Sequence, residues 1–417
     1  MTKSRVSAIV GIFIATTIAW FILGLTIVDR TQKGYQNIGP QVQNLWGNQL
    51  TQLAPVVHMF PAADGKDSLD QFANRSTAKA TPLDLSSSDI TANMKLEYRR
   101  KGLLWFSGYM LDYAGSYSVT NPSSSARIFV VDFTFPSQQA SYDEFIFTVD
   151  GKDHQTRTEN GTRSVFSLAP GQVAHIKLGF KTRGMGSWSY SFGEGVTRVQ
   201  NFQLVVTTDF GNYDFPDGTI SPQVKRQTGG GSELTWKSKS LLSSFKVGVT
   251  VPQKLNPGEL AARIAFFAPL GLFFFFLVMI VFCLTRRVNL HPIHFLFLSA
   301  GFFVFQLLFT YLVDHVSVTG SFLISALVSL ALVVNYIRMV TGLRFALFPT
   351  AFAQIVYLVL FSYAFFFKGF TGLTITIGTV ITLALLMQVT GKIDWERTFT
   401  TRAQKASSEP PVTPGAG

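Results

Sequence analysis

Hydrophobic and polar positions divide this chain into long apolar runs and one long stretch in which the two kinds alternate. An apolar run, VSAIVGIFIATTIAWFILGLTIV, fills residues 6–28. A helix needs roughly 20 apolar residues to cross a bilayer, so this run and five later ones predict six membrane-spanning helices, the fourth of them short. The later runs lie at about 261–284, 295–313, 322–337, 345–367 and 373–389.

Residues 29–259 have a different character, because charges, Gly, Pro and Ser return there and apolar residues recur at every second position. A period of two is typical of a strand with one buried face. The dipeptides Asp150-Gly151 and Asn160-Gly161 are hairpin signals. We therefore expect an inserted all-β, sandwich-like domain of antiparallel strands, with a helix at 35–53 ahead of them. The buried faces are predicted to carry Ile176, Leu178 and Phe180 in one strand and Phe202, Leu204 and Val206 in another.

Basic residues indicate the orientation of the predicted helices, because Lys and Arg accumulate in cytoplasmic loops. With a cytoplasmic N-terminus, the short loops on the opposite side hold only Asp314 with His315 and then Lys368. Both termini are therefore predicted to be cytoplasmic, and the alternating stretch is predicted to be exported to the opposite side of the membrane. The basic residues assigned to the cytoplasm are Lys3, Arg5, Arg286, Arg287, Arg338, Arg344, Lys392, Arg397, Arg402 and Lys405.

This orientation divides the chain into four parts. We expect a transmembrane anchor at 1–28, an exported β-rich domain at 29–259 and a five-helix transmembrane bundle at 260–390. A cytoplasmic tail at 391–417 follows, with disorder predicted from about residue 406. The first apolar run exceeds the roughly 7–15 residues of a signal-peptide core and lacks a cleavage site, so it predicts an uncleaved anchor.

Composition agrees with a membrane protein and removes other classes. Of the 417 residues, 47% are hydrophobic and 14% are charged, whereas about a quarter are charged in soluble domains. The net charge of +11 is explained largely by the cytoplasmic Lys and Arg residues, and no basic stripe with interleaved aromatic residues indicates nucleic-acid binding. Cys283 is the only cysteine, which excludes an intramolecular disulfide and a zinc site with several cysteine ligands.

Motifs that carry enzyme chemistry are missing, since no H-E-x-x-H, G-x-S-x-G or Walker A pattern occurs. The glycines at 229–231 lead into Ser232-Glu233 instead of Lys-Ser or Lys-Thr, so we expect a flexible loop there. His291 and His294 have a spacing that can serve a metal, but two ligands fall short of the four usual for zinc. We predict no catalytic residue, metal site or cofactor, and we interpret both histidines as interfacial residues.

The predicted spans carry amides but no charge at mid-span, which counts against a proton- or sodium-coupled transporter. Gln306, Asn335, Gln354 and Gln388 are predicted to make interhelical hydrogen bonds. Small residues at every fourth position predict close helix packing within the chain, with a dimer interface as the alternative. They are Ser321, Ser325 and Ser329 in one span and Thr374, Gly378 and Thr382 in another.

A basic run, Arg99, Arg100 and Lys101, precedes an aromatic-rich stretch in "LEYRRKGLLWFSGY". Such a patch can bind an anionic envelope polymer or a lipid headgroup. It can equally be a solvated turn between two strands. Both interpretations stay open at the level of sequence.

Several stretches resemble the CreD-like inner-membrane proteins, a bacterial family of colicin tolerance and envelope integrity. They are "YRRKGLLWFSGY", "GEGVTRVQNFQLVVTTDF", "GGGSELTWKSKSLLSSFKVGV", Leu290-His291-Pro292 and Ile393-Asp394-Trp395. The resemblance covers most of the chain from about residue 95, whereas residues 35–94 lack a stretch expected for the family and His294 replaces a non-histidine polar residue. It implies a bacterial inner membrane, with the β-rich domain at 29–259 in the periplasm. It also implies a role in envelope stress and the β-lactam response, and it brings no catalytic residue with it.

The two motifs that most resemble the family in the membrane part fall on the same cytoplasmic face. We therefore predict a cluster of His291, Pro292, Asp394 and Trp395, in which His291 approaches Asp394 or Trp395 within about one interhelical spacing, roughly 10 Å.

Taken with the topology, these features predict a non-enzymatic protein that maintains or senses the state of the envelope through its periplasmic domain. A transporter or channel subunit for a solute or lipid is the alternative, and a membrane enzyme acting on an envelope lipid comes third. The expected partners are the lipid bilayer and other envelope proteins, and the sequence leaves the oligomeric state open.

Overall fold

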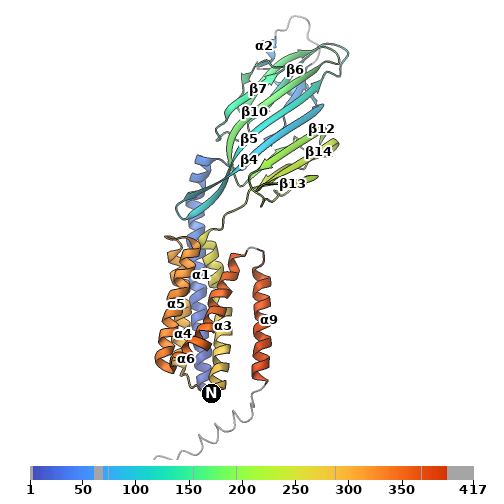
Figure 1. The fold of residues 1–417 in the computed structure, drawn as a ribbon. Coiled ribbons are helices and arrows are strands. Elements are labelled where there is room, and N and C mark those ends of the chain that lie inside the picture. Colours follow the sequence, from blue (N-terminus) through green and yellow to red (C-terminus); the bar gives the residue numbers. More distant parts are fainter. Residues whose placement is uncertain are drawn as a thin grey trace, which may run out of the picture. The chain divides into compact units, whose positions relative to one another are not determined.

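The computed structural model describes residues 3–60, 69–73, 75–153, 155–193, 195–286, 288–367 and 369–391. They form two compact units (Figure 1). The β-sheet unit is Gly34–Leu255, and the helical unit comprises the residues up to Lys33 and from Asn256 onward. The predicted disordered tail lies outside the described residues.

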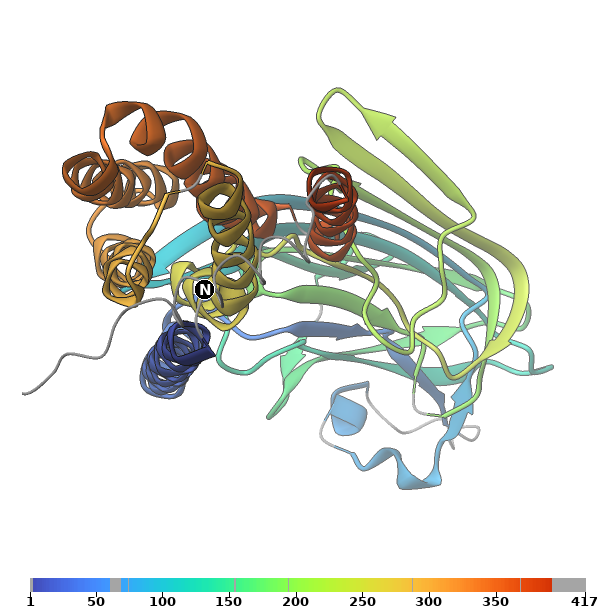
Figure 2. The same ribbon diagram turned by 90° about the horizontal axis from the view of Figure 1, so that it is seen from below.

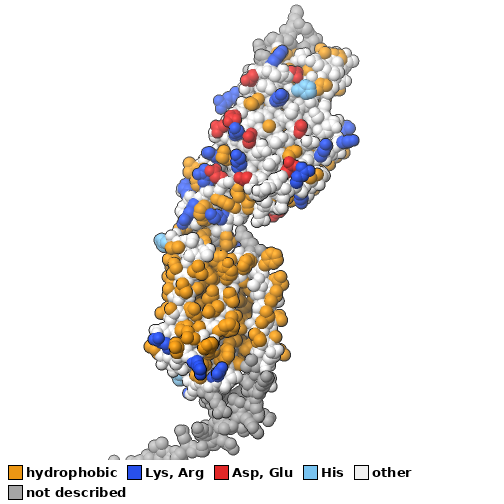
Figure 3. Space-filling model, in the orientation of Figure 1, with side chains coloured by type: hydrophobic (Ala, Val, Ile, Leu, Met, Phe, Trp, Pro, Cys, Tyr) orange, Lys and Arg blue, Asp and Glu red, His pale blue; other side chains and the backbone are white. Residues whose placement is uncertain are grey.

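Each of the six apolar runs forms a helix long and apolar enough to cross a membrane, so the six predicted helices are confirmed. Hydrophobic side chains cover the visible face of the helical unit, as expected for contact with lipid (Figure 3). The helices are α1 (Lys3–Trp46), α3 (Pro257–Thr285), α4 (Pro292–Leu312), α5 (Val318–Thr341), the run Leu343–Phe366 and α9 (Thr371–Thr390). The run comprises α6 (Leu343–Phe345), α7 (Phe352–Gln354) and α8 (Phe361–Tyr363), the π segments η2 (Ala346–Ala351) and η3 (Ile355–Leu360), and the 3-10 segment η4 (Ala364–Phe366).

The helix around Pro349 departs from α geometry for a reason visible in the sequence. Proline has no N–H to donate to the carbonyl four residues earlier, which is that of Phe345. The Thr350 hydroxyl donates to this carbonyl oxygen instead, at 3.1 Å, within the π segment η2. The freed carbonyl is thereby satisfied inside an apolar environment.

Among the described residues, the β-sheet unit contains three sheets, and the largest can be followed in Figure 1. The largest has the order β13-β14-β12-β4-β5-β10-β7, and its strands curve strongly when seen from below (Figure 2). Its strands are β4 (Ser87–Lys101), β5 (Leu104–Thr120), β7 (Asp143–Val149), β10 (Val173–Met185), β12 (Thr197–Thr208), β13 (Val224–Thr228) and β14 (Gly231–Ser243).

Two smaller sheets complete the unit, with the orders β3-β2-β6-β9-β8 and β1-β11-β15. The first comprises β2 (Val56–Met59), β3 (Thr81–Leu83), β6 (Arg127–Thr134), β8 (Thr156–Arg157) and β9 (Gly161–Leu168). The second comprises β1 (Leu50–Leu53), β11 (Ser187–Ser191) and β15 (Val247–Thr250).

A single hydrophobic cluster joins one face of the seven-stranded sheet to both smaller sheets. The Phe180 ring of β10 lies 6.2 Å from the Phe133 ring of β6, and the Tyr113 ring of β5 lies 6.2 Å from the Trp188 ring of β11. The two sets of alternating residues predicted to be buried all lie inside, at 2% exposure or less. The alternation therefore identified the buried face correctly.

The all-β, antiparallel prediction needs correction for two strand pairs and one short helix, and the helix predicted at 35–53 has different bounds. β12 pairs with β4 and β1 pairs with β11 in parallel, because both connections are long crossovers instead of hairpins. A short helix, α2 (Leu69–Ala73), packs its Phe72 ring 5.0 Å from the ring of Phe60. The helix predicted at 35–53 is the end of α1 as far as Trp46, after which residues 50–53 form β1.

The turn predicted at Asp150-Gly151 is confirmed, because this dipeptide favours a left-handed backbone. Asp150 and Gly151 have φ values of 48° and 76° in the turn that closes Val149 against Lys152. The glycines predicted to form a flexible loop instead make a tight turn between β13 and β14, with Gly229 at φ 51° and Gly230 at φ 121°.

Candidate functional site

A row of four polar side chains crosses the outer face of the seven-stranded sheet. The strand register pairs Thr207 with Asn93, Asn93 with Asp112, and Asp112 with Lys181. These residues come from the adjacent strands β12, β4, β5 and β10, so neighbouring side chains stand about 4.8 Å apart along the row. We call this set, Thr207, Asn93, Asp112 and Lys181, the polar row.

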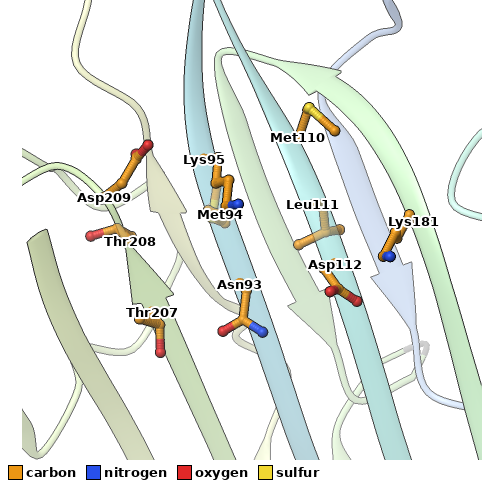
Figure 4. A pocket seen from close by; sticks show the side chains of 10 residues that line it. All are labelled: Asn93, Met94, Lys95, Met110, Leu111, Asp112, Lys181, Thr207, Thr208 and Asp209. Atoms are coloured by element: carbon orange, nitrogen blue, oxygen red, sulfur yellow. The ribbon is translucent and has the colours of Figure 1, made fainter.

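The polar row lies along a groove of about 520 Å³ (Figure 4). Met110, with 41% of its surface exposed, adds an apolar contact to the groove. Backbone or side chains of Met94, Lys95, Leu111, Thr208 and Asp209 complete the lining. Polar groups and charges of both signs beside an apolar surface are typical of a binding site.

Charges in the groove are partly balanced by neighbours. Lys181 forms an ion pair with Glu144 at 2.6 Å, and this hydrogen bond, together with the charges of Glu144 and Asp112, raises the pKa of Lys181. The Asp209 carboxylate accepts the backbone N–H of Leu96 at 2.8 Å, which ties the end of β12 to β4. Asp112 and Lys95 are both exposed and add one charge of each sign.

A second hollow of about 130 Å³ continues from the groove. The two share Met110 and Lys181 in their linings. The second is bounded by the end of α1 at 45–47 and by the loop at 139–141. A ligand longer than one side chain can therefore contact β12 at one end and the end of α1 at the other.

The predicted basic run, Arg99, Arg100 and Lys101, lies at the end of β4, where Gly102 and Leu103 turn the chain into β5. The Arg99 guanidinium pairs with Glu97 and lies 5.6 Å from the Trp46 ring. The Nε atom of Arg100 donates to the carbonyl oxygen of Gly102 at 3.1 Å, and its guanidinium lies 5.9 Å from the Trp105 ring. The run therefore forms the last residues of a strand, directly before a turn, and it is also a surface of stacked cations and aromatic rings.

The predicted cytoplasmic cluster is described only in part. His291 caps α4, since its Nδ1 atom accepts the Ile293 N–H at 3.4 Å, and Pro292 begins the helix. The Nδ1 atom of His294 lies 2.8 Å from the Tyr336 hydroxyl. Asp394 and Trp395 lie outside the described residues, so their approach to His291 stays a prediction. Within the described ranges, no three His, Cys, Asp or Glu side chains are grouped as metal ligands would be.

Amide side chains of the spans behave in two ways. Gln306 donates to the carbonyl oxygen of Ala261 in α3 at 3.2 Å, and Gln354 donates to the Ser329 hydroxyl of α5 at 3.0 Å. These two confirm the predicted interhelical hydrogen bonds. Asn335 and Gln388 are exposed.

The two small-residue stripes also differ. Ser321, Ser325 and Ser329 are fully buried, and the Ser329 hydroxyl donates to the carbonyl oxygen of Gly301 at 2.7 Å. This confirms close packing within the chain for the first stripe. In the second stripe, Thr374 and Gly378 are exposed, and only Thr382 is buried. The Tyr357 hydroxyl donates a hydrogen bond to the Thr382 hydroxyl at 3.1 Å.

Contacts between α1 and later loops agree with the predicted alternation of sides. Arg5 donates to the Asn289 side chain at 2.8 Å, and both were assigned to the cytoplasmic side. Arg30 forms an ion pair with Asp314 at 2.9 Å, and both were assigned to the opposite side.

No pattern in the sequence indicates the polar row. Alternation predicts only that each of its members faces outward, and all four are ordinary surface residues in composition. Their alignment depends on the pairing of β12 with β4, across more than 100 residues of chain. The contact between the Asp209 carboxylate and the Leu96 N–H depends on the same pairing.

Together, six apolar helices and a large β-sheet unit with a surface groove define a polytopic membrane protein with an extramembrane domain. The family model described as "Inner membrane protein CreD" matches residues 219–396. The match covers the last strands of the β-sheet unit and the five candidate membrane spans after α1, and it confirms the resemblance to the CreD-like inner-membrane family.

Other comparisons add little. No curated protein matches this chain. Among solved structures, one described as a "putative nutrient binding protein" from Legionella pneumophila subsp. pneumophila str. Philadelphia 1 is 9% identical. The similarity covers 55% of this chain and 76% of that chain, with a TM-score of 0.33, a value too low to support an argument about this chain.

Proposed function

We propose that this chain is a non-enzymatic inner-membrane protein that maintains or senses the state of the bacterial cell envelope by binding a ligand or partner protein in the groove along the polar row. The observation that carries the proposal is the groove itself, in which four adjacent strands present donors, acceptors and both signs of charge. The rigid sheet holds these groups in fixed positions, which favours specific binding.

Two features favour binding over chemistry. Among the residues that line the groove, Asp112 and Asp209 are the only acids. The Asp209 carboxylate already accepts the backbone N–H of Leu96. No histidine, cysteine or serine is among the lining residues, and the ammonium group of Lys181 is held in an ion pair with Glu144. Its residues are suited to hydrogen bonding and charge pairing.

A crosslinking experiment in cells tests the proposal. A photo-reactive amino acid placed at Asn93 or at Asp112 should capture a specific partner or ligand. Val173 provides the matched control, because it is also exposed and lies on the same face of β10 as Lys181 but outside the groove. Capture at Val173 equal to that at Asn93, or no capture at either groove position, would contradict the proposal.

A second test links the groove to the envelope. Asp112→Asn and Lys181→Gln should weaken the ability of the protein to restore β-lactam and colicin responses in cells that lack it. The variant Lys237→Gln, on exposed β14 outside the groove, should restore them fully. Equal restoration by all three variants at equal membrane abundance would argue against the groove.

Transport is the second candidate, and one observation favours it. The side-chain carbonyl oxygens of Gln306 and Gln354 are buried in the helical unit without a hydrogen-bond partner among the described atoms. Such groups can contact a passing solute. Around them, however, the interior is filled by rings such as Phe275 and Phe302, whose centroids are 4.6 Å apart. Solute flux in proteoliposomes that is abolished by Gln306→Leu would favour transport over the binding proposal.

A further inference from the structure

The strands β4 and β5 extend beyond the rest of their sheet as a two-stranded ribbon. β12 pairs with β4 only as far as Met94, and β10 pairs with β5 only from Gly108. Residues 95–107 therefore project from the sheet, as Figure 1 shows. We call residues 98–105, which form the end of this ribbon, the hairpin tip.

The hairpin tip combines charge, aromatic rings and an exposed apolar apex. Arg100 and Lys101 lie next to the turn, and Leu103 at the turn is 41% exposed. The ammonium group of Lys254 lies 3.5 Å from the centroid of the Trp105 ring and 5.4 Å from that of Tyr98. The only acid among these groups, Glu97, pairs with Arg99, so the surface is strongly positive overall.

This combination is suited to the headgroup region of a membrane. Trp and Tyr rings favour the level of the headgroups, because one part of each ring system is apolar and another is polar. Lys and Arg can keep their charges at phosphate groups while their aliphatic stems contact apolar surface. An exposed leucine between them can enter the upper part of the acyl region.

Two chain segments connect the β-sheet unit to the helices, one at its start and one at its end. Both segments contact the end of the β4–β5 ribbon. On the α1 side, the Leu104 side chain lies 3.4 Å from the Cβ position of Gly34, and the Tyr35 ring lies 6.3 Å from the Phe106 ring. On the α3 side, Lys254 packs on Trp105, directly before the unit ends at Leu255.

These connections are short, which decides between a membrane and a soluble polymer as the partner. The apolar run of α1 ends at Val28, and a helix rises about 9 Å over the six residues from there to Gly34. The helix α3 begins at Pro257, two residues after Leu255. The hairpin tip is thus at the end of the β-sheet unit from which the chain enters the bilayer.

We propose that the hairpin tip, together with Lys254, binds the headgroups of anionic phospholipids in the outer leaflet of the bilayer that holds the helices. Binding there places Leu103 at the acyl boundary. The inference is independent of what the groove binds.

Depth-dependent fluorescence quenching in the full-length protein tests this. A fluorophore is attached at Leu103→Cys in a Cys283→Ser background, and the protein is reconstituted in vesicles that contain a lipid-linked quencher. Vesicles of phosphatidylcholine alone are compared with vesicles that also contain phosphatidylglycerol. Quenching should be several-fold stronger with phosphatidylglycerol and should fall as salt concentration rises, because salt screens the charges. Equal quenching in both vesicles overturns the proposal.

Two controls separate charge from folding. The triple variant Arg100→Gln, Lys101→Gln, Lys254→Gln should lose the added quenching with phosphatidylglycerol. The matched triple variant Lys225→Gln, Lys237→Gln, Lys239→Gln removes the same charge from exposed positions of β13 and β14 and should keep it. Equal loss in both triples would reduce the effect to net charge and overturn the proposal.

A further experiment distinguishes anionic lipid from a soluble anionic polymer as the partner of the hairpin tip. A soluble polyanion added to phosphatidylcholine vesicles should leave the Leu103→Cys label accessible to a water-soluble quencher. If the polyanion protects the label as fully as phosphatidylglycerol does, the hairpin tip recognises anionic polymers and the lipid proposal fails.

Discussion

The hydroxyl of Tyr336 in α5 lies 2.8 Å from the Nδ1 atom of His294 in α4. The ring of Phe297, one turn along α4, lies 4.9 Å from the same tyrosine ring. His294 therefore belongs to a packed contact between two helices, and its neighbour His291 caps the start of α4. The pair that has metal-ligand spacing in the sequence thus serves two different structural purposes.

This contact should carry measurable energy. A double-mutant cycle with His294→Phe and Tyr336→Phe is expected to give a coupling of about 0.5–1.5 kcal/mol, the usual net value of one hydrogen bond. The free energy of unfolding of the purified full-length protein can be measured by titration with a denaturing detergent. Strictly additive effects of the two substitutions would mean that the hydrogen bond contributes nothing to stability.

Close packing between α3 and the run after α5 should make Gly271 irreplaceable. A Cβ atom there would meet the carbonyl oxygen of Tyr357, and backbone cannot move aside as a flexible side chain can. We expect Gly271→Ala to destabilise the helical unit by about 1–3 kcal/mol. Gly378→Ala is the control, because its Cβ position has no neighbour within 4 Å. It should be neutral or slightly stabilising in thermal unfolding, and a loss equal to that of Gly271→Ala would contradict the packing argument.

Acid should destabilise the β-sheet unit partly through His58. Burial lowers the pKa of His58, the charge of Asp132 opposes that shift, and the charge of Arg163 adds to it. Because the folded pKa is lower than the unfolded value of 6.5, the unfolded chain binds the proton more tightly. The stability contributed by the neutral imidazole is therefore complete above pH 6.5 and is lost as pH falls through the folded pKa. The melting temperature of His58→Gln should change less between pH 7 and pH 5 than that of the wild type. An unchanged pH slope would show that His58 has no part in it.

Arg163 holds three segments of the β-sheet unit together. Its Nε and Nη2 atoms donate to the two carboxylate oxygens of Asp132 at 2.6 and 2.9 Å, and its Nη1 atom donates to the carbonyl oxygens of Ala73 and Arg75. Lysine cannot reproduce this planar geometry, so Arg163→Lys should cost about 1.5–3 kcal/mol.

The control for this substitution is Arg226→Lys. Arg226 pairs with Glu233 at 3.4 Å on the surface, with 67% of its side chain exposed, so its replacement should change stability by less than about 1 kcal/mol. Both variants can be compared by chemical unfolding of the full chain. Equal effects would show that the geometry around Arg163 adds nothing.

Topology can be tested with reporter fusions. A reporter after Gly320 and a reporter after Ala406 should lie on opposite sides of the membrane, with the second in the cytoplasm. The paired contacts Arg5 with Asn289 and Arg30 with Asp314 favour this alternation. If both reporters lay on the same side, the number of membrane crossings between Gly320 and Ala406 would be even, which would contradict the predicted topology.

Prediction from sequence worked where the deciding property is local. The alternation at 176–180 identified a buried face because side chains of a strand point to opposite sides in turn. The turn at Asp150-Gly151 was recognisable because few residues tolerate a positive φ. Prediction from sequence failed for the strand at 50–53, where four residues pair in parallel with β11, more than 130 residues away. No local pattern encodes that partner.

The sequence by itself determined the six helices and the buried faces of the strands around 176–180 and 202–206, because bilayer thickness and strand geometry act on short stretches of chain. Only the tertiary structure decided which side chains meet. Thr207, Asn93, Asp112 and Lys181 form one row because β12, β4, β5 and β10 pair in a particular order and register. Lys254 stacks on Trp105 because the chain returns to the hairpin tip before it enters α3. Both depend on contacts between distant segments, whose free energy comes from burying a shared core and is therefore a property of the whole β-sheet unit.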